Sequence, residues 1–330
     1  MNVQIYRTNA SSYQDSGFFQ KEKEILEKIE GVKYIKSLNE INDTDPFILL
    51  TNTHTKPQNL AKVLLDKTIL VIHPNSGHDN FPLDFIKQAS FPIVIGNPIR
   101  SHAVVEYTMS TLFHHFTKIE NHLHWDDDRV WNRKLLRDQK VLILGNGHIG
   151  KVLSRSLDSL CREVVVYDPF QKNDFQSDNY KSDFALEMFD GVQLLILAAS
   201  LNETSKHIIN ADVLKRLDPE CIIINPARGE LIKEDDLIHY LQKNPRAFAY
   251  LDVFEQEPFK PGYLHDLKNI NKTSHIAGVY QGLNKDIINF EYHIVKEFLE
   301  YYRAQNEQKF QSDYNHCLLK SKISENNILI

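Results

Sequence analysis

The feature that most constrains this chain is a cluster of three glycines directly after an apolar run at 141–144: Gly145, Gly147 and Gly150. Only 12 of the 330 residues are glycine, which is about half of the usual share of roughly 7%. Three of them so close together indicate a backbone requirement. Apolar residues then recur at helical spacing over 149–160. The pattern therefore predicts a buried strand, a tight turn and a helix.

A second apolar run at 164–167 ends at Asp168, so strand, turn, helix and strand occupy 28 residues. A unit of about 30 residues is the one in which G-x-G-x-x-G binds a dinucleotide. Gly145 permits the turn, Gly147 lets the backbone approach a pyrophosphate, and Gly150 lets the helix pack against the strand. The helix N-terminus offers N–H groups to the phosphates. A glycine turn without a ligand and a methyltransferase that binds S-adenosylmethionine stay open as alternatives.

Asp168 bears on which dinucleotide is bound. Its carboxylate would accept hydrogen bonds from the adenosine ribose and would repel a 2′-phosphate. No arginine follows directly in Asp168-Pro169-Phe170. We therefore expect NAD rather than NADP, while Lys172 lies near enough to keep NADP open.

Apolar runs alternate with amphipathic segments along most of the chain, which is typical of βα units around parallel sheets. Short apolar runs predict strands that are buried on both faces, at 3–6, 47–51, 69–73, 93–95, 141–144, 164–167, 194–198, 221–225 and 248–251. The patterns predict helices at 20–29 and, as the longest, at 100–124. About 140 residues precede the glycine turn, so we expect a complete domain before it. The tail at 301–330 is predicted to be a last helix with a loose end.

Composition narrows the function classes. A net charge of −6 predicts no nucleic-acid partner. No run approaches the ~18 apolar residues of a membrane span, and the N-terminus lacks the apolar segment of a secretory signal. Three widely spaced cysteines, Cys161, Cys221 and Cys317, indicate neither disulfides nor a zinc site. We therefore expect a cytoplasmic protein without a membrane contact.

Three further motifs carry polar residues just after apolar runs: Arg228 in IIINPARGELI (222–232), Asp252 and Glu257 in LDVFEQEP (251–258), and His275 in TSHIAG (273–278). Loops at the carboxyl ends of parallel strands form the ligand crevice, so these side chains can converge beside a nicotinamide. An arginine binds a carboxylate bidentately, and a histidine beside a carboxylate is a proton donor near neutral pH. An arginine, a carboxylate and a histidine brought together in this way suit hydride transfer to a 2-oxo acid.

These segments resemble the D-isomer-specific 2-hydroxyacid dehydrogenase family. NPARGELI is similar to that family's N-x-ARG-x-L-V, LDVFEQEP to LDVF-x-x-EP and SHIAG to PHIAG. SGHDNFPLDF (76–85) is similar to the substrate-domain loop GyDNiD, and NPIRSHAVVEYTM (97–109) to the entry of a long crossover helix. The resemblance runs from about residue 77 to residue 278. The chain departs from the pattern at three places: Asn146, Ala199-Ser200 and Ser274.

The resemblance implies the catalytic roles. Arg228 would bind the substrate carboxylate and polarise its carbonyl. His275 would be the general acid/base, with Glu257 orienting it. The formate dehydrogenase branch has Gln in place of this Glu, so Glu257 argues against that branch.

The resemblance also implies the binding residues. Ser76 and Gly77 would offer backbone N–H groups to the substrate carboxylate, and Asp252 would contact the carboxamide side of the nicotinamide. The other residues expected to bind the cofactor lie in the same motifs: Gly145, Gly147, His148, Ile149, Gly150, Asp168, Pro226, Ala227 and Gly278.

The fold implied is α/β, with two Rossmann-like domains built on parallel sheets. Residues 1–99 and 286–330 would form a discontinuous, flavodoxin-like substrate-binding domain, and residues 100–285 the NAD-binding domain. The long helix would contribute to a homodimer.

We expect an enzyme that transfers a hydride reversibly between NAD(H) and a small D-2-hydroxy acid or 2-oxo acid, in a cleft between the domains. An NADH-sensing, corepressor-like interaction protein on the same fold is the alternative. We expect no metal, because the histidines and aspartates at 114–128 lack ligand spacing: His114, His115, His122, His124 and Asp126–Asp128.

Overall fold

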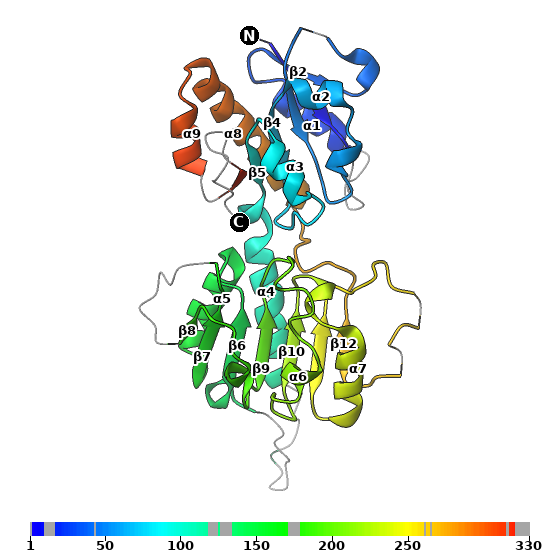
Figure 1. Ribbon diagram of the computed structural model, residues 1–330, viewed down its shortest axis with the longest axis vertical. Helices are drawn as coiled ribbons and strands as arrows, with labels where there is room; N and C mark the ends of the chain where they lie inside the picture. The colour runs from blue at the N-terminus through cyan, green and yellow to red at the C-terminus, as the bar shows by residue number, and fades with distance from the viewer. Residues whose placement is uncertain are drawn as a thin grey trace. The chain divides into compact units, whose positions relative to one another are not determined.

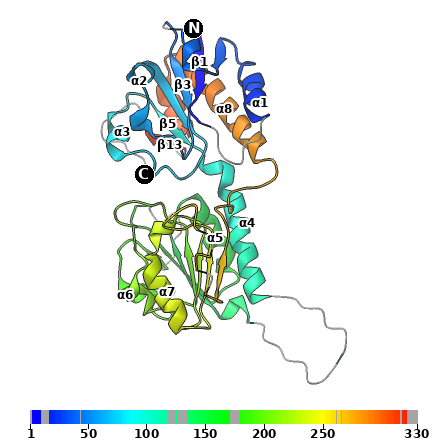
Figure 2. The same ribbon diagram turned by 90° about the vertical axis from the view of Figure 1, so that its right-hand side faces the viewer.

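The computed structural model describes residues 2–9, 17–42, 44–117, 125, 134–170, 179–260, 262–264, 266–314 and 317–320. The chain divides into two compact units. The first unit combines Met1–Arg100 with Tyr280–Ile330, and the second is Ser101–Val279. Each unit is an α/β structure around one sheet (Figures 1 and 2).

The first unit is built on a six-stranded sheet in the order β13-β5-β4-β3-β1-β2. Its strands are β1 (Val3–Arg7), β2 (Val32–Ile35), β3 (Phe47–Leu50), β4 (Thr68–His73), β5 (Ile93–Ile95) and β13 (Leu318–Lys320). The five parallel strands follow the order 2-1-3-4-5, which is that of flavodoxin-like sheets. In such a sheet the chain reverses its winding between β1 and β3, so a crevice opens at their carboxyl ends.

Helices cover both faces of this sheet, and alternate residues of one strand serve the two faces. Ile48 and Leu50 pack with side chains of α8 (Leu283–Arg303), whereas Phe47 and Leu49 pack with Leu64 of α2 (Lys62–Lys67). The remaining helices are α1 (Phe18–Leu26), α3 (Leu83–Gln88) and α9 (Glu307–Tyr314). In Figure 2, α1 and α8 lie on one side of the strands and α2 and α3 on the other.

The C-terminal segment contains more regular structure than the predicted helix with a loose end. Within 301–330 the structure describes the end of α8, all of α9 and the strand β13. β13 pairs antiparallel with β5, and Cys317 and Leu318 are buried in the core beside it. Burial of these two side chains holds β13 against the edge of the sheet.

The second unit contains a seven-stranded parallel sheet in the order β12-β11-β10-β9-β6-β7-β8. Its strands are β6 (Lys140–Leu144), β7 (Glu163–Tyr167), β8 (Tyr180–Lys181), β9 (Leu194–Leu197), β10 (Ile222–Asn225), β11 (Phe248–Leu251) and β12 (Ile270–Lys272). Read outward from β6, this is the doubly wound order of dinucleotide-binding sheets, with the switch point between β6 and β9. The predicted α/β fold class is confirmed.

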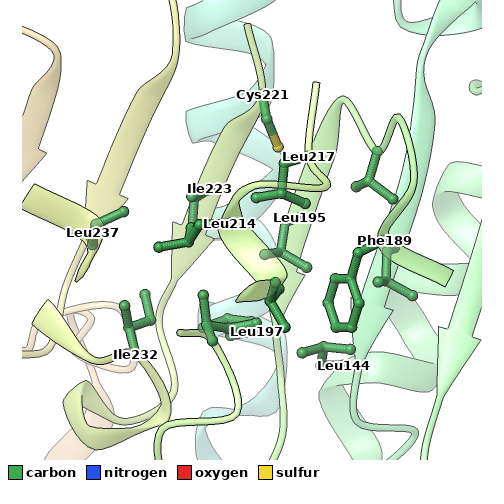
Figure 3. Close-up of a cluster of buried hydrophobic side chains, with 14 of the residues drawn as sticks. Leu144, Phe189, Leu195, Leu197, Leu214, Leu217, Cys221, Ile223, Ile232 and Leu237 are labelled. Carbon is green, nitrogen blue, oxygen red and sulfur yellow. The ribbon is translucent and has the colours of Figure 1, made fainter. Parts of the chain in front are cut away.

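Helices α4 (Asn97–Phe116) and α5 (His148–Asp158) supply side chains to the core on one face of this sheet. On the other face, α6 (Ala211–Leu214) and α7 (Glu234–Lys243) enclose the cluster drawn in Figure 3. There Phe189 and Leu214 lie over Leu195 and Leu197 of β9. Short 3₁₀ helices complete the described structure: Leu38–Glu40, Pro57–Asn59, Leu136–Asp138, Leu186–Phe189 and Gly229–Leu231.

α4 is the helix that the sequence predicts at 100–124. The described part of the helix begins earlier, at Asn97, and runs to Phe116, while residues 118–124 lie outside the described part. Within the described residues no helix combines the length and the apolarity that a bilayer crossing requires.

Candidate functional site

The glycine turn lies at the switch point of the second sheet, as its motif predicts. Gly145 follows β6 with φ +105°, a conformation that favours glycine. A Cβ atom there would lie 2.6 Å from the backbone of Ala198 after β9. A Cβ atom at Gly150 would lie 1.9 Å from the Gly145 carbonyl oxygen. The fold itself therefore requires glycine at both positions.

Gly147 differs from the other two glycines. Within the described residues, no atom lies within 4 Å of the place where its Cβ would be. Gly147 is also the N-cap of α5, where it supplies no side chain to bind the first N–H groups of that helix. The packing of the protein does not require a glycine here, and the turn leaves room for an anionic ligand at the helix N-terminus.

Asp168 is buried at the end of β7, where it holds the glycine turn. Its Oδ2 accepts a hydrogen bond from the backbone N–H of Asn146 at 2.7 Å, and its Oδ1 accepts one from Phe170 at 2.9 Å. The side chain of Asn146 takes no part in the first bond, so this departure from the family pattern leaves the turn intact. Asp168 thus ties the loop after β6 to the loop after β7.

Arg228 follows β10 in a turn that Asn225 organises. The Asn225 Oδ1 accepts the N–H of Ala227 at 3.1 Å, and its Nδ2 donates to the Arg228 carbonyl at 2.8 Å. A Cβ atom at Gly229 would lie 1.9 Å from the Phe254 backbone, so glycine is required for the two loops to touch. The Arg228 side chain is half-buried, and its Nη1 donates to the Ala227 carbonyl at 2.7 Å. Sequence analysis missed the role of Asn225, although an Asn-Pro pair after a strand is a turn signal.

Glu257 and His275 form a hydrogen-bonded pair in the loops after β11 and β12. The His275 Nδ1 lies 2.8 Å from the Glu257 Oε2, and the Glu257 Oε1 accepts the N–H of Phe254 at 3.0 Å. A carboxylate only accepts, so Nδ1 carries the proton and Nε2 is the nitrogen available to another molecule. Both side chains are partly exposed to solvent: the exposed fraction is 35% for Glu257 and 49% for His275.

Electrostatics link Arg228 to this pair. Partial burial by itself would raise the pKa of the Glu257 carboxyl. The hydrogen bond and charge of His275, the N–H of Phe254 and the charge of Arg228 outweigh burial and hold the pKa below its usual value. The structure thus places two of the predicted catalytic residues, His275 and Arg228, where they act on the carboxyl of the third, Glu257.

This shift makes the pH response of Glu257 testable. A carboxyl with a lowered pKa contributes stability at pH above its unfolded value, and this contribution is lost as pH falls through the lowered value. We expect a carbon-detected NMR titration of Glu257 to give a pKa below ~4.3. In His275→Asn the pKa should rise, because the largest lowering interaction is removed. An unchanged pKa in that variant would refute this account of the pair.

Asp252 anchors the loop that carries His275. Its carboxylate is fully buried and accepts the N–H groups of Ile276 and Ala277, each at 2.8 Å. Its carbonyl accepts the N–H of His275 at 2.7 Å. His275 itself has φ +57°, a left-handed conformation that a histidine keeps only when its surroundings impose it. The contact with a nicotinamide that the resemblance implies for Asp252 stays a prediction.

Ser76 and Gly77 belong to the first unit, in the loop after β4, whereas the residues above belong to the second. Both are half-buried. The Gly77 carbonyl accepts a hydrogen bond from the Nε2 of His73 at 2.9 Å, and the Nδ1 of His73 lies 3.0 Å from the Thr51 hydroxyl. Burial lowers the pKa of His73 to about 3. The ring is therefore neutral, and its hydrogen bond to Gly77 stabilises the loop. His73 was not among the predicted site residues, and its contact with Thr51 spans 22 positions of the chain.

The other predicted cofactor residues lie in these same loops. His148 and Ile149 form the first turn of α5, Pro226 and Ala227 lie between β10 and Arg228, and Gly278 follows the His275 loop.

Several residues that the sequence analysis weighed lie outside the described residues: Lys172, His122, His124 and Asp126–Asp128. Among the residues that the structure describes, no group of three or more His, Cys, Asp or Glu side chains is arranged to hold a metal ion.

Comparison with known proteins tests the resemblance. Residues 108–277 match the family described as D-isomer specific 2-hydroxyacid dehydrogenase, NAD binding domain. The chain is 32% identical over 249 residues to an erythronate-4-phosphate dehydrogenase of Blochmanniella floridana, a match that spans 73% of this chain and 61% of that enzyme. The chain thus covers about six-tenths of this relative's length.

Solved structures extend the likeness to the fold. A 3-phosphoglycerate dehydrogenase of Entamoeba histolytica aligns with a TM-score of 0.68 at 18% identity, over 91% of this chain and 96% of that one. A D-lactate dehydrogenase of Aquifex aeolicus aligns with a TM-score of 0.68 at 20% identity over the same shares. The family match covers more than half of the chain, and the predicted membership is confirmed. The chain belongs to the D-isomer-specific 2-hydroxyacid dehydrogenase family and carries its NAD-binding domain.

Proposed function

We propose that this protein is an oxidoreductase that transfers a hydride between NAD(H) and a small D-2-hydroxy acid or 2-oxo acid. The observation that carries the proposal is the His275–Glu257 pair at 2.8 Å with Arg228 close enough to lower the pKa of the carboxyl. A cation, a proton donor and an anion that orients the donor are the groups that reduction of a 2-oxo acid requires.

The glycine turn fits the cofactor. Open space at Gly147 and the N-terminus of α5 suit a pyrophosphate. Asp168 lies at the end of the next strand, where it would bind the ribose hydroxyls and disfavour a 2′-phosphate. NAD(H), when bound, supplies or accepts the hydride.

The residues of the chain do the remaining work. Arg228 binds the substrate carboxylate and polarises the neighbouring carbonyl. During reduction the His275 Nε2 donates a proton to the carbonyl oxygen, and during oxidation it takes the proton back. Glu257 holds the ring through Nδ1 and stabilises its protonated form. In the first unit, the N–H groups of Ser76 and Gly77 are the proposed substrate-binding groups.

Replacement of Arg228 with lysine tests the carboxylate contact. Lysine keeps the charge but loses the planar fork that binds a carboxylate bidentately. We expect the KM for the acid to rise about tenfold, the loss of one charge-assisted hydrogen bond, with a smaller fall in kcat. Steady-state kinetics at saturating NADH measure both constants. An unchanged KM would count against this role.

The reaction itself is tested by NADH oxidation with purified protein. The panel contains hydroxypyruvate, glyoxylate, pyruvate, 2-oxoglutarate, phenylpyruvate and 3-phosphohydroxypyruvate, and erythronate 4-phosphate with NAD⁺ is added because relatives bear that name. Rapid turnover of one acid supports the proposal and names the substrate. Tight NADH binding without turnover of any acid would favour an NADH-sensing interaction protein instead.

We also propose that the chain forms a homodimer through the second unit. Two large apolar side chains support this assembly: Phe113 on α4 is 41% exposed and Leu135 is 38% exposed. Light scattering of the purified protein gives the molar mass, and a monomer of 38.4 kDa would overturn the proposal.

A further inference from the structure

We propose that Tyr107 and Thr273 are positioning residues for His275, acting through the buried carboxylate of Asp252. The proposal rests on the function proposed above, because it assigns His275 the proton transfer. Thr273 opens the TSHIAG motif and Tyr107 lies within NPIRSHAVVEYTM, but neither is among the predicted site residues, and the two lie 166 positions apart in the chain.

The hydrogen bonds run in one direction. The Thr273 Oγ1 lies 2.6 Å from the Asp252 Oδ1. The carboxylate also receives the N–H groups of Ile276 and Ala277, so it acts as an acceptor and Thr273 donates. A hydroxyl has one proton, so Thr273 must accept from the Tyr107 hydroxyl, which lies 2.7 Å away. Tyr107 on α4 therefore donates to Thr273, and Thr273 donates to Asp252.

Protonation of the Tyr107 hydroxyl is consistent with its role as the donor to Thr273. Burial of the tyrosine and the nearby charge of Asp252 raise the pKa of its hydroxyl. Tyr107 therefore keeps its proton across the pH range in which an enzyme is assayed and remains a donor.

The far end of the chain of bonds is the His275 backbone. Asp252 accepts the N–H of His275 with its carbonyl and those of the next two residues with its carboxylate. These bonds surround a residue whose φ is +57°. A carboxylate that turns away from its acceptor position would release two of the three N–H groups. The direction of the imidazole toward Glu257 thus depends on the donor that fixes the Asp252 side chain, which is Thr273.

The structure offers a matched control. The Tyr250 hydroxyl lies 3.0 Å from the Nδ1 of His115, so Tyr250 also links α4 to the second sheet through one hydrogen bond. Within the described part of the chain, the Tyr250 hydroxyl forms no hydrogen bond with Asp252. Tyr250→Phe therefore removes a tyrosine hydroxyl that links α4 to a neighbouring strand, β11, and leaves the bonds of the His275 loop in place.

The first experiment compares steady-state kinetics of Tyr107→Phe, Thr273→Val, Thr273→Ser and Tyr250→Phe. We expect Thr273→Val to lower kcat by ~10- to 10²-fold, because small displacements of a reacting group have effects of that size. Tyr107→Phe removes one hydrogen bond of the series and should lower kcat about three- to tenfold. Thr273→Ser should restore kcat. Values of Tyr107→Phe and Thr273→Val equal to those of Tyr250→Phe would overturn the proposal.

The second experiment needs no turnover. NMR spectra of the protein with ¹⁵N-labelled histidine, assigned with His275→Gln, report the ring of His275. We expect one sharp set of signals in the wild type, Thr273→Ser and Tyr250→Phe, and shifted or broadened signals in Tyr107→Phe and Thr273→Val. If the wild type reduces no acid but these signals change, the proposed function fails and the positioning role stands. Unchanged signals refute the positioning role, whatever the activity. If Thr273→Val does not fold, Tyr107→Phe decides.

Discussion

Replacement of His275 with alanine is expected to lower the kcat for reduction of the 2-oxo acid by ~10²- to 10⁴-fold, the usual contribution of a general acid. The Nδ1 of His275 is bonded to Glu257 at 2.8 Å, so alanine removes the ring that would give a proton from Nε2. Alanine keeps a Cβ at a position with φ +57°, so the backbone requirement does not change. The loss should therefore fall on the chemical step.

The measurement is kcat for the variant at saturating NADH and acid, together with the dissociation constant of NADH from fluorescence. We expect the dissociation constant to stay within about twofold, because the glycine turn and Asp168 lie on other loops. His239→Ala removes an exposed histidine of α7 in the same unit and serves as the control. Turnover of His275→Ala equal to that of His239→Ala would show that His275 is not the proton donor.

Replacement of Arg7 with methionine is expected to destabilise the protein by about 3–5 kcal/mol, the usual effect of removing one partner from a buried ion pair. The Arg7 Nε lies 2.8 and 2.9 Å from the two carboxylate oxygens of Glu22, and its Nη2 pairs with Glu291. The Tyr34 hydroxyl donates to Glu22 as well. These side chains join β1, α1, β2 and α8, and they are almost wholly buried.

The cluster of Arg7, Glu22 and Glu291 contains more acidic than basic groups. Two carboxyl groups face one guanidinium, and within the described residues neither the Nη1 of Arg7 nor the Oε2 of Glu291 has a hydrogen-bond partner. Burial and the neighbouring charge of Glu22 raise the pKa of Glu291 well above its usual value, against the lowering effect of Arg7. We therefore infer that Glu291 is neutral and Glu22 carries the charge that Arg7 compensates.

The raised pKa of Glu291 makes the stability of the protein depend on pH. Between the unfolded and the folded pKa of Glu291 the native state binds more protons, so stability falls as pH rises through that window. Glu291→Gln keeps a neutral side chain of similar size, so it should cost little and should remove this dependence. Urea denaturation of wild type, Arg7→Met and Glu291→Gln at several pH values measures these effects.

Lys23→Met is the control for Arg7→Met. Lys23 of α1 forms a half-exposed ion pair at 3.7 Å with Glu27, the residue that follows the helix, and pairs of this kind add little to stability. We expect a much smaller loss than for Arg7→Met. Equal losses for the two variants, or a larger loss for Glu291→Gln than for Arg7→Met, would contradict the charge assignment.

Much of the second unit could be predicted from the sequence, because its signals are local. The glycine turn, its strands and the motifs around Arg228, Glu257 and His275 each lie within a few residues of the chain. Central strands such as β6 and β9 are buried on both faces, so they appear as unbroken apolar runs. The edge strands gave no such signal. β12, with the residues Ile-Asn-Lys, is only partly buried, and its pattern resembles a loop.

The family, the dinucleotide turn and the candidate catalytic residues could be predicted from the sequence, because each motif lies within a few residues of the chain. The partners that hold those residues in place became visible only in the folded structure. Arg7 meets Glu291 across 284 positions of the chain, and Tyr107 meets Thr273 across 166. His73 meets Thr51 across 22 positions. Such contacts arise when strands and helices distant in sequence pack together, and no local pattern of residue types records them.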